Sequence, residues 1–156
     1  GVKAETNRLD DEGLLPSSMA LTPWNAGAGV RDPDDHVEPG DQQSPLNKDF
    51  YANLKAQAWW QLRRRFERTH RARTEPGFTY DASDLISLPS TLPKIRQIEK
   101  ELSQPTAKRD GRMRLLVDKA PEGTRSPNVA DAIVMAFWPV LTDGYDPGMW
   151  AKLLDG

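Results

Sequence analysis

The chain has 156 residues, of which 28% are charged, and its formal net charge is −2. This length fits one domain or a piece of a larger one. The absence of cysteine excludes disulfides, thiolate catalysis and zinc sites built on cysteine. His36 and His70 lie far apart, so any metal is expected on oxygen ligands, as is usual for Mg²⁺ or Mn²⁺. No apolar run has membrane-spanning length and no signal peptide opens the chain, so we expect neither a membrane protein nor a secreted one.

The chain opens without a methionine, in a pattern typical of the middle of a helix. Apolar residues between positions 2 and 9 predict that helix, and Gly13 is a plausible stop for it. We therefore interpret the chain as a fragment whose upstream part is missing. Residues 19–24 alternate weakly and predict a short strand. Residues 25–48 are rich in glycine, proline and acids without periodicity, which favours a long flexible loop over a functional lid.

The longest predicted helix covers residues 50–71, with Asp49 as its N-cap. Apolar residues recur along it every four positions: Phe50, Leu54, Ala58, Leu62 and Phe66. This stripe is typical of an amphipathic helix that packs on a core. Arginines crowd its other end, between positions 63 and 73. They are interpreted either as a solvated helix end, which the sequence alone favours, or as a patch that contacts phosphate.

A shorter helix is predicted at residues 93–102, and residues 108–111 predict a turn. Residues 112–118 alternate between apolar and polar side chains and predict a half-buried strand. A short basic connection leads to a last helix, which Pro139 ends, and residues 140–156 form a predicted tail.

The last predicted helix contains the feature that points to chemistry. Ser126 is a good N-cap and Pro127 suits the first helical position, so Asp131 lies about one turn into this helix. Residues 129–138 are otherwise apolar. Burying an ionised carboxylate without a partner is unfavourable, so we expect a cation or a metal at Asp131. The sequence contains no Gly-rich phosphate loop, no nucleophile elbow and no His-Glu-x-x-His pair.

The order of these motifs resembles the C-terminal nuclease domain of terminase large subunits, the DNA-packaging motors of tailed phages and prophages. Three pieces carry the resemblance: GVKAETNRLDDEGLL followed by LTPWNAGAG, then DFYANLKAQAWWQLRRRF, then KAPEGTRSPNVADAIVMAF. Together they span roughly residues 1–137. The last piece is the most specific. The middle piece is similar to an aromatic helix of that family through Asn53, Ala56, Trp59 and Trp60.

This resemblance implies an α/β, RNase H-like nuclease fold, here one partial domain over residues 1–156 that lacks the first core strands. It implies three carboxylates that bind two divalent metals, Mg²⁺ or Mn²⁺. Asp131 matches the third carboxylate, as metal ligand and catalytic residue, and the other two would precede this chain. Lys119 and Arg125 come just before Asp131 and are candidates for contacts to the cut DNA strand. Arg63 and Arg64 are further candidates for DNA contacts.

The implied function is metal-dependent cleavage of concatemeric double-stranded DNA in the host cytoplasm. The implied partners are a terminase small subunit and a portal protein, with no membrane involved. No Walker motif is present, so this piece does not hydrolyse ATP by that mechanism. Two alternatives stay open: a non-catalytic DNA-binding or assembly module, which includes an inactive fragment, and another nuclease or recombinase of the same fold. A molecule that begins at Gly1 is expected to have weak or no nuclease activity.

Overall fold

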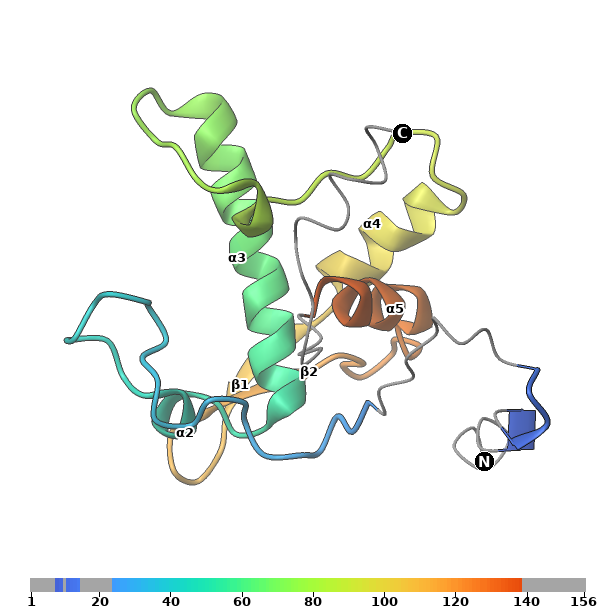
Figure 1. Ribbon diagram of the computed structural model, residues 1–156, viewed down its shortest axis with the longest axis horizontal. Coiled ribbons are helices and arrows are strands. Elements are labelled where there is room, and N and C mark those ends of the chain that lie inside the picture. Colours follow the sequence, from blue (N-terminus) through green and yellow to red (C-terminus); the bar gives the residue numbers. More distant parts are fainter. Residues whose placement is uncertain (1–7, 10, 15–23, 139–156) are drawn as a thin grey trace. The chain divides into compact units, whose positions relative to one another are not determined.

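The computed structural model describes residues 8–9, 11–14 and 24–138, which fall into two units that are treated separately (Figure 1). The predicted strand at residues 19–24, except its last residue, and the predicted tail at residues 140–156 lie outside the described residues.

The described part of the first unit is a helix end. The Leu14 amide donates a hydrogen bond to the Leu9 carbonyl at 2.9 Å, and Gly13 between them has a φ of +66°. A glycine in the left-handed region is a common helix terminator. The predicted stop at Gly13 is therefore confirmed.

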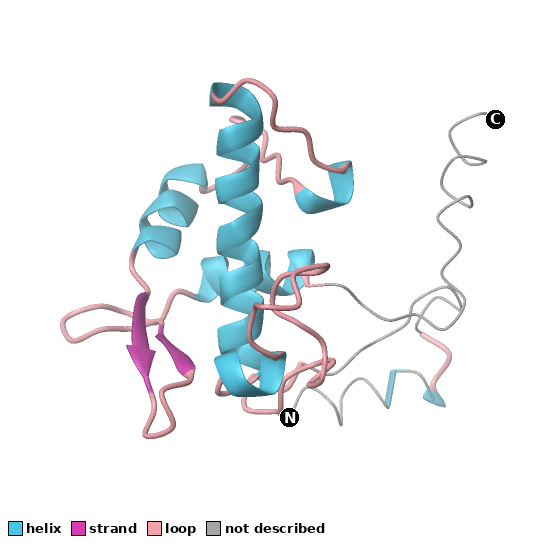
Figure 2. Cartoon of the chain, turned by 90° about the vertical axis from the view of Figure 1, so that its left-hand side faces the viewer, coloured by secondary structure: helices cyan, strands magenta, loops and turns pink. Residues whose placement is uncertain are grey.

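The second unit, residues 24–138, contains a central helix, three shorter helices, a 3₁₀ turn and a two-stranded sheet (Figure 2). The elements are α2 (Asn47–Phe50), α3 (Leu54–Thr74), η1 (Ala82–Asp84), α4 (Ile95–Ser103), β1 (Thr106–Arg109), β2 (Leu115–Asp118) and α5 (Asn128–Phe137). The helix α3 contacts both α5 and β2, and α4 packs against α5. The helices predicted at residues 93–102 and after Ser126 are confirmed as α4 and α5.

The long predicted helix is interrupted near its start, so the prediction of one helix from residue 50 is wrong. Tyr51 forms an isolated parallel bridge with Leu115 of β2. The amide of Ala52 donates to the Leu115 carbonyl at 2.9 Å. These contacts require extended backbone between α2 and α3. Tyr51 is buried, and this burial raises the pKa of its phenol to about 12.

The N-cap of α3 is Asn53 and not Asp49, so the predicted cap is also wrong. The Asn53 carbonyl oxygen accepts a hydrogen bond from the Ala56 amide at 2.9 Å. Asp49 lies inside α2. The helix therefore starts where the chain leaves its pairing with β2.

The core forms where α3 meets α5. Its buried members are Ala58, Trp59, Leu62, Ile86, Ala130, Val134 and Trp138. A smaller cluster of Tyr51, Ala56 and Leu115 lies where α3 meets β2. The predicted apolar stripe of the long helix is therefore largely confirmed. Phe66, at the end of that stripe, is 37% exposed because a groove opens beside it between α3 and α4.

The strand predicted at residues 112–118 is half correct, because only Leu115–Asp118 pair as β2. Its partner β1 includes residues 108 and 109, which the sequence predicts to lie in a turn at residues 108–111. The observed turn lies later, at residues 110–114. The Asp110 carboxylate causes this shift, since it accepts hydrogen bonds from the amides of Arg114 and Arg112, each at 2.9 Å. The same amides, Arg114 first, hold the pKa of Asp110 below its ordinary value.

Residues 25–48 contain no helix or strand apart from the start of α2, as predicted. Turns and an isolated bridge between His36 and Leu46 order their backbone. The buried side chain of Gln57 holds this segment against α3, because it accepts from the Arg31 amide and donates to the Arg31 carbonyl at 2.7 and 3.0 Å. The flexibility of residues 25–48 stays a prediction.

The cap assignment gives a stability test. Asn53→Ala removes the acceptor for the Ala56 amide, and we expect it to lower the free energy of unfolding by about 1 kcal/mol. Asp49→Ala is the matched control, and its effect should stay within about 0.5 kcal/mol because Asp49 caps no helix. Urea denaturation followed by circular dichroism measures both. Equal losses for the two variants would contradict the assignment.

Candidate functional site

Asp131 lies in the first turn of α5, close to where the sequence predicts it, but the predicted cap is wrong. The helix begins at Asn128, and Pro127 occupies the N-cap position without a side-chain hydrogen bond. Ser126 is exposed and lies outside the helix. The cap instead comes from a different helix.

Glu101, in the last turn of α4, caps α5. One of its carboxylate oxygens, Oε2, accepts hydrogen bonds from the amides of Val129 and Ala130 at 2.8 and 3.0 Å. These are among the amides that a helix start leaves without an intrahelical partner. The Ala130 amide is the main reason that the pKa of Glu101 lies below its ordinary value, with further contributions from Gln97 and the Val129 amide.

Gln104, three residues further along, holds the loop that precedes α5. Its Nε2 donates to the carbonyls of Lys119 and Arg125 at 2.6 and 2.7 Å. Both ends of residues 119–125 are therefore fixed to the same side-chain amide. Glu101 and Gln104 together position the backbone on either side of the candidate site.

Lys119 and Asp131 form an ion pair between the end of β2 and the start of α5. Their side chains are 30% and 23% exposed, so the pair is partly shielded but open to solvent. The expected cation at Asp131 is thus a lysine of the same chain. α5 is less buried than its composition suggests, because Ala130 and Val134 are buried while Met135 is exposed.

Asp118, next to Lys119 in sequence, has a different partner. Its carboxylate pairs with Lys108 across the hairpin at 2.5 Å, and this hydrogen bond is the main cause that holds the pKa of Asp118 below its ordinary value. Within residues 8–9, 11–14 and 24–138, no three His, Cys, Asp or Glu side chains are grouped to hold a metal. Asp131 therefore fits a divalent metal as one carboxylate ligand, next to a lysine, and further ligands would have to come from elsewhere.

The two α3 arginines proposed for DNA contacts have partners within the fold. Arg64 donates to the Val37 carbonyl at 2.8 Å and pairs with Glu38, and only 14% of its side chain is exposed. Arg63 is more exposed, pairs with Glu67 at 2.8 Å and lies over the ring of Trp60. Arg64 thus holds residues 37–38 against α3 through a hydrogen bond and an ion pair. The side chain of Arg63 is exposed at the surface.

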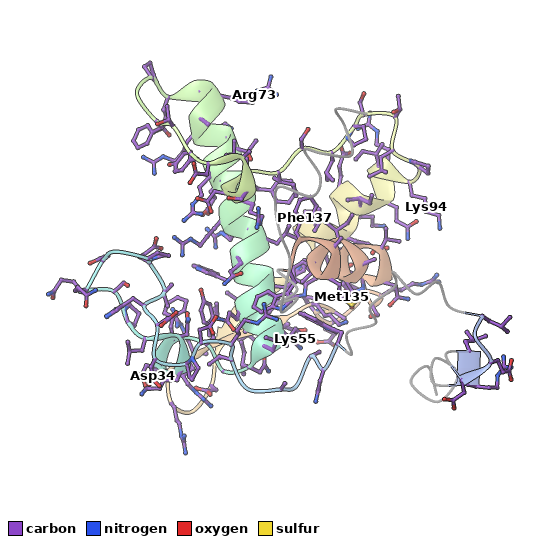
Figure 3. The ribbon with its side chains drawn as sticks, viewed as in Figure 1. Asp34, Lys55, Arg73, Lys94, Met135 and Phe137 are labelled. Carbon is purple, nitrogen blue, oxygen red and sulfur yellow. The ribbon has the colours of Figure 1, made fainter. Side chains whose placement is uncertain are left out.

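Two further arginines of α3 also have partners within the fold. Arg68 pairs with Asp84 at 2.6 Å, and Arg71 pairs with Glu75 and lies 3.8 Å from the centroid of the Phe78 ring. A cavity of about 440 Å³ at this end of α3 is lined by both arginines, together with Glu38 and other polar side chains. Figure 3 shows Arg73 at the far end of α3 and Lys55 at its beginning. The arginine run is therefore extensively paired with protein groups.

Arg125 is exposed in the loop before α5. Within the described part of the chain, its side chain has no ion-pair partner. The structure thus brings Lys119, Asp131 and the backbone of Arg125 together, and it ties Arg63 and Arg64 to other segments. Glu101 and Gln104 are the positioning residues that sequence reasoning missed, since their partners lie 15 to 29 positions away.

No family model and no curated protein matches this chain. It is similar to a solved structure, the nuclease domain of the large terminase subunit gp2 of bacterial virus Sf6, with a TM-score of 0.74 and 24% identity. That match covers 90% of this chain and 62% of the solved chain, so this chain spans less than two thirds of it.

Two mutant structures of the same Sf6 domain match with the same identity and coverage. One was solved with manganese and beta-thujaplicinol and has a TM-score of 0.72, and the other was solved with calcium and has a TM-score of 0.71. These likenesses confirm the predicted fold class, an α/β fold of the RNase H-like type. No helix in the described residues is long and apolar enough to cross a membrane.

The cap on α5 predicts how stability depends on pH. Because its folded-state pKa is depressed, Glu101 stabilises the fold above its ordinary pKa of 4.5, and this contribution is lost as the pH falls through the lower folded value. Glu101→Gln should therefore lower the urea midpoint at pH 7, and its difference from the wild type should shrink towards pH 3.

The matched control is Glu99→Gln, which removes an exposed carboxylate from the same helix. Its effect at pH 7 should be smaller, because Glu99 pairs only with Arg96 at the surface. A Glu101→Gln defect of the same size at pH 7 and pH 3 would show that the charge of Glu101 has no part in the cap.

Proposed function

We propose that this chain is the nuclease part of a phage or prophage DNA-packaging terminase, which cuts concatemeric double-stranded DNA by metal-dependent hydrolysis. The observation that carries the proposal is the Asp131–Lys119 pair at the capped start of α5. It lies where the sequence resemblance expects the third metal-binding carboxylate. The similarity of the fold to a terminase nuclease domain supports the proposal, as does the manganese in one of those structures.

In the proposed site, the carboxylate of Asp131 would hold one divalent ion, Mg²⁺ or Mn²⁺. Two such ions in a nuclease site lower the pKa of a bound water and offset the charge that develops on the cut phosphate. The two further carboxylates are expected upstream of this chain. Glu101 contributes indirectly, because it fixes the first turn of α5 and hence the position of the Asp131 carboxylate.

Lys119 is proposed to contact the DNA strand at the cut. While it is paired with Asp131, it keeps a cation beside the carboxylate. With a metal on Asp131, the ammonium group of Lys119 would be available to a phosphate oxygen. Arg125 is proposed as a second phosphate contact, because it lies in the loop that begins at Lys119 and its side chain is exposed. Arg63 is a weaker candidate for such a contact, and Arg64 would first have to leave Glu38.

The proposed setting follows from this function. The full terminase would act with a small subunit and a portal protein in the host cytoplasm. Another RNase H-like nuclease stays an alternative, because the similarity at 24% identity concerns the fold.

A non-catalytic DNA-binding or assembly module is the second candidate. The observation that favours it is that Asp131 and its lysine already satisfy each other, with no group of metal ligands in the described residues. Such a module would bind DNA with strong salt dependence and without a metal requirement.

The deciding experiment is Asp131→Asn in the full-length protein. We expect nicking of supercoiled plasmid in Mg²⁺ or Mn²⁺ to fall by about 10²-fold or more, the scale of losing one group that stabilises a transition state. Glu122→Gln is the control, because it removes an exposed carboxylate from the loop between Lys119 and α5. Its nicking rate should stay near that of the wild type.

A binding measurement separates metal loss from misfolding. Mn²⁺ should raise the melting temperature of the wild type and of Glu122→Gln by more than that of Asp131→Asn, since ligand binding to the folded state stabilises it. Metal-dependent nicking at the wild-type rate in Asp131→Asn would refute the assignment and leave the DNA-binding module as the better proposal.

A further inference from the structure

The loop between β1 and β2 has an unusual residue at its most constrained position. The Asp110 amide donates to the Arg114 carbonyl at 3.0 Å, and the Met113 amide donates to the Asp110 carbonyl at 2.9 Å. These bonds close a three-residue hairpin loop whose last residue, Met113, has a φ of +62°. Hairpin loops of this length place a left-handed residue there, and that residue is usually glycine.

Met113 gains no packing in return for this backbone conformation. Its side chain is 72% exposed, more than any other large apolar side chain among the described residues. A residue with a Cβ atom is unfavourable in the left-handed region, and glycine would relieve that strain. Strained positions that the fold does not need are typical of functional sites. We therefore expect Met113 to contact a partner molecule, since it does not contribute to the packing of this chain.

The hairpin holds Met113 rigidly. Arg114 pairs with Asp110 at 2.8 Å, which ties one side of the loop to the other. The Arg109 guanidinium donates to the Met113 carbonyl at 3.1 Å and lies over the ring of Phe50. At the base, Leu115 is buried and bonded to the segment before α3. Because the backbone of the loop is already fixed, placing this side chain in a groove costs little backbone conformational entropy.

The charges around Met113 favour a polyanionic partner. Lys108 pairs with Asp118 and Arg114 pairs with Asp110, so among the described residues Arg109 and Arg112 are the cations of this hairpin without a carboxylate partner. Arg112, next to Met113, is exposed, and its side chain has no hydrogen-bond or ion-pair partner within the described part of the chain. Proteins that bind the minor groove often combine arginine with an apolar wedge such as methionine.

The position of the hairpin relative to Asp131 is consistent with one shared duplex. β2 runs from the loop to Lys119, which pairs with Asp131. The six residue-to-residue steps from Met113 to Lys119 span at most about 20 Å at the rise of a strand. This is about half of a helical turn of DNA, which is about 34 Å long. Figures 1 and 2 show the loop projecting outward from the two strands.

We propose that the tip of the β1–β2 hairpin is a contact site for duplex DNA, with Met113 in a groove and Arg112 on a phosphate. The choice of DNA as the partner rests on the proposed function. The evidence for the contact is the exposed Met113, whose backbone is in the left-handed region, next to Arg112, whose side chain has no partner within the described part of the chain.

The test is fluorescence anisotropy with a labelled duplex in the absence of divalent metal, so that binding is measured without cleavage. Met113→Gly should weaken binding by about fivefold or more, because the apolar contact is lost. Its melting temperature should be unchanged or higher, because glycine suits the left-handed position. Met113→Leu keeps an apolar side chain and should bind nearly as well as the wild type.

The cation is tested separately. Arg112→Ala should reduce the slope of log K against log salt by about 1, as expected for one lost phosphate contact. Arg96→Ala removes an exposed arginine from α4 and serves as the control, with an unchanged slope. Equal slopes for the two variants, or wild-type affinity in Met113→Gly, would overturn the proposal.

A fluorescent label gives an independent measurement, because the chain contains no cysteine. An environment-sensitive dye on Met113→Cys should respond to duplex DNA, and the same dye on Met135→Cys in α5 should respond less. A response at position 113 to anionic phospholipid vesicles but not to DNA would overturn the proposal in favour of a membrane contact.

These results are distinguishable from those for the proposed nuclease function. Weaker binding in Met113→Gly together with metal-dependent nicking at the wild-type rate in Asp131→Asn would support the hairpin contact and reject the proposed role of Asp131 in the nuclease. Metal-dependent cleavage with wild-type binding in Met113→Gly and Arg112→Ala would support the nuclease and reject the hairpin contact.

Discussion

The candidate site depends on one carboxylate that caps a helix from a different element. α5 has no side-chain cap of its own, and Glu101 on α4 accepts the first amides that the helix leaves unpaired. Gln104, the residue just after the same helix, donates a hydrogen bond to the Lys119 carbonyl. The distance between Lys119 and Asp131 is therefore governed by α4, which carries neither residue. Changes in how α4 packs against α5 would alter the geometry of the ion pair before they disturbed the core.

Local patterns predict the features whose physical cause is local. The apolar sequence around Asp131 predicts a cation beside this carboxylate, and the structure supplies Lys119. The stop at Gly13 and the stripe of α3 likewise follow from nearby residues. The break before Asn53 does not, because it comes from pairing with Leu115, more than sixty positions away. The cap from Glu101 is missed for the same reason. The RNase H-like fold came from the order of three motifs and not from any single one.

The arginines of α3 show why charge alone does not define a binding surface. In the sequence, a solvated face and a phosphate-contacting patch look the same, because the acids that pair with the arginines are scattered. Glu38 and Asp84 lie in segments that pack along α3. Glu38 forms an ion pair with Arg64, and Asp84 forms one with Arg68. The hairpin loop is the opposite case. The sequence of this loop has no long run of positive charge. The positive φ of Met113, which only the structure reveals, marks the loop as a candidate contact site. Local charge density predicts such surfaces poorly, since the outcome depends on which cations the fold has already paired.

The cap on α5 also has a consequence for the order of folding. A helix of ten residues is too short to persist alone in water, where helices below about 12 residues are marginal. Its stabilising carboxylate lies 28 and 29 positions away, so the chain must close that loop before the first turn of α5 is complete. The first turn of α5, which contains Asp131, is therefore expected to form only after α4 has docked. A nascent or partly unfolded chain would carry the residue without the site, which confines any activity to the fully folded protein.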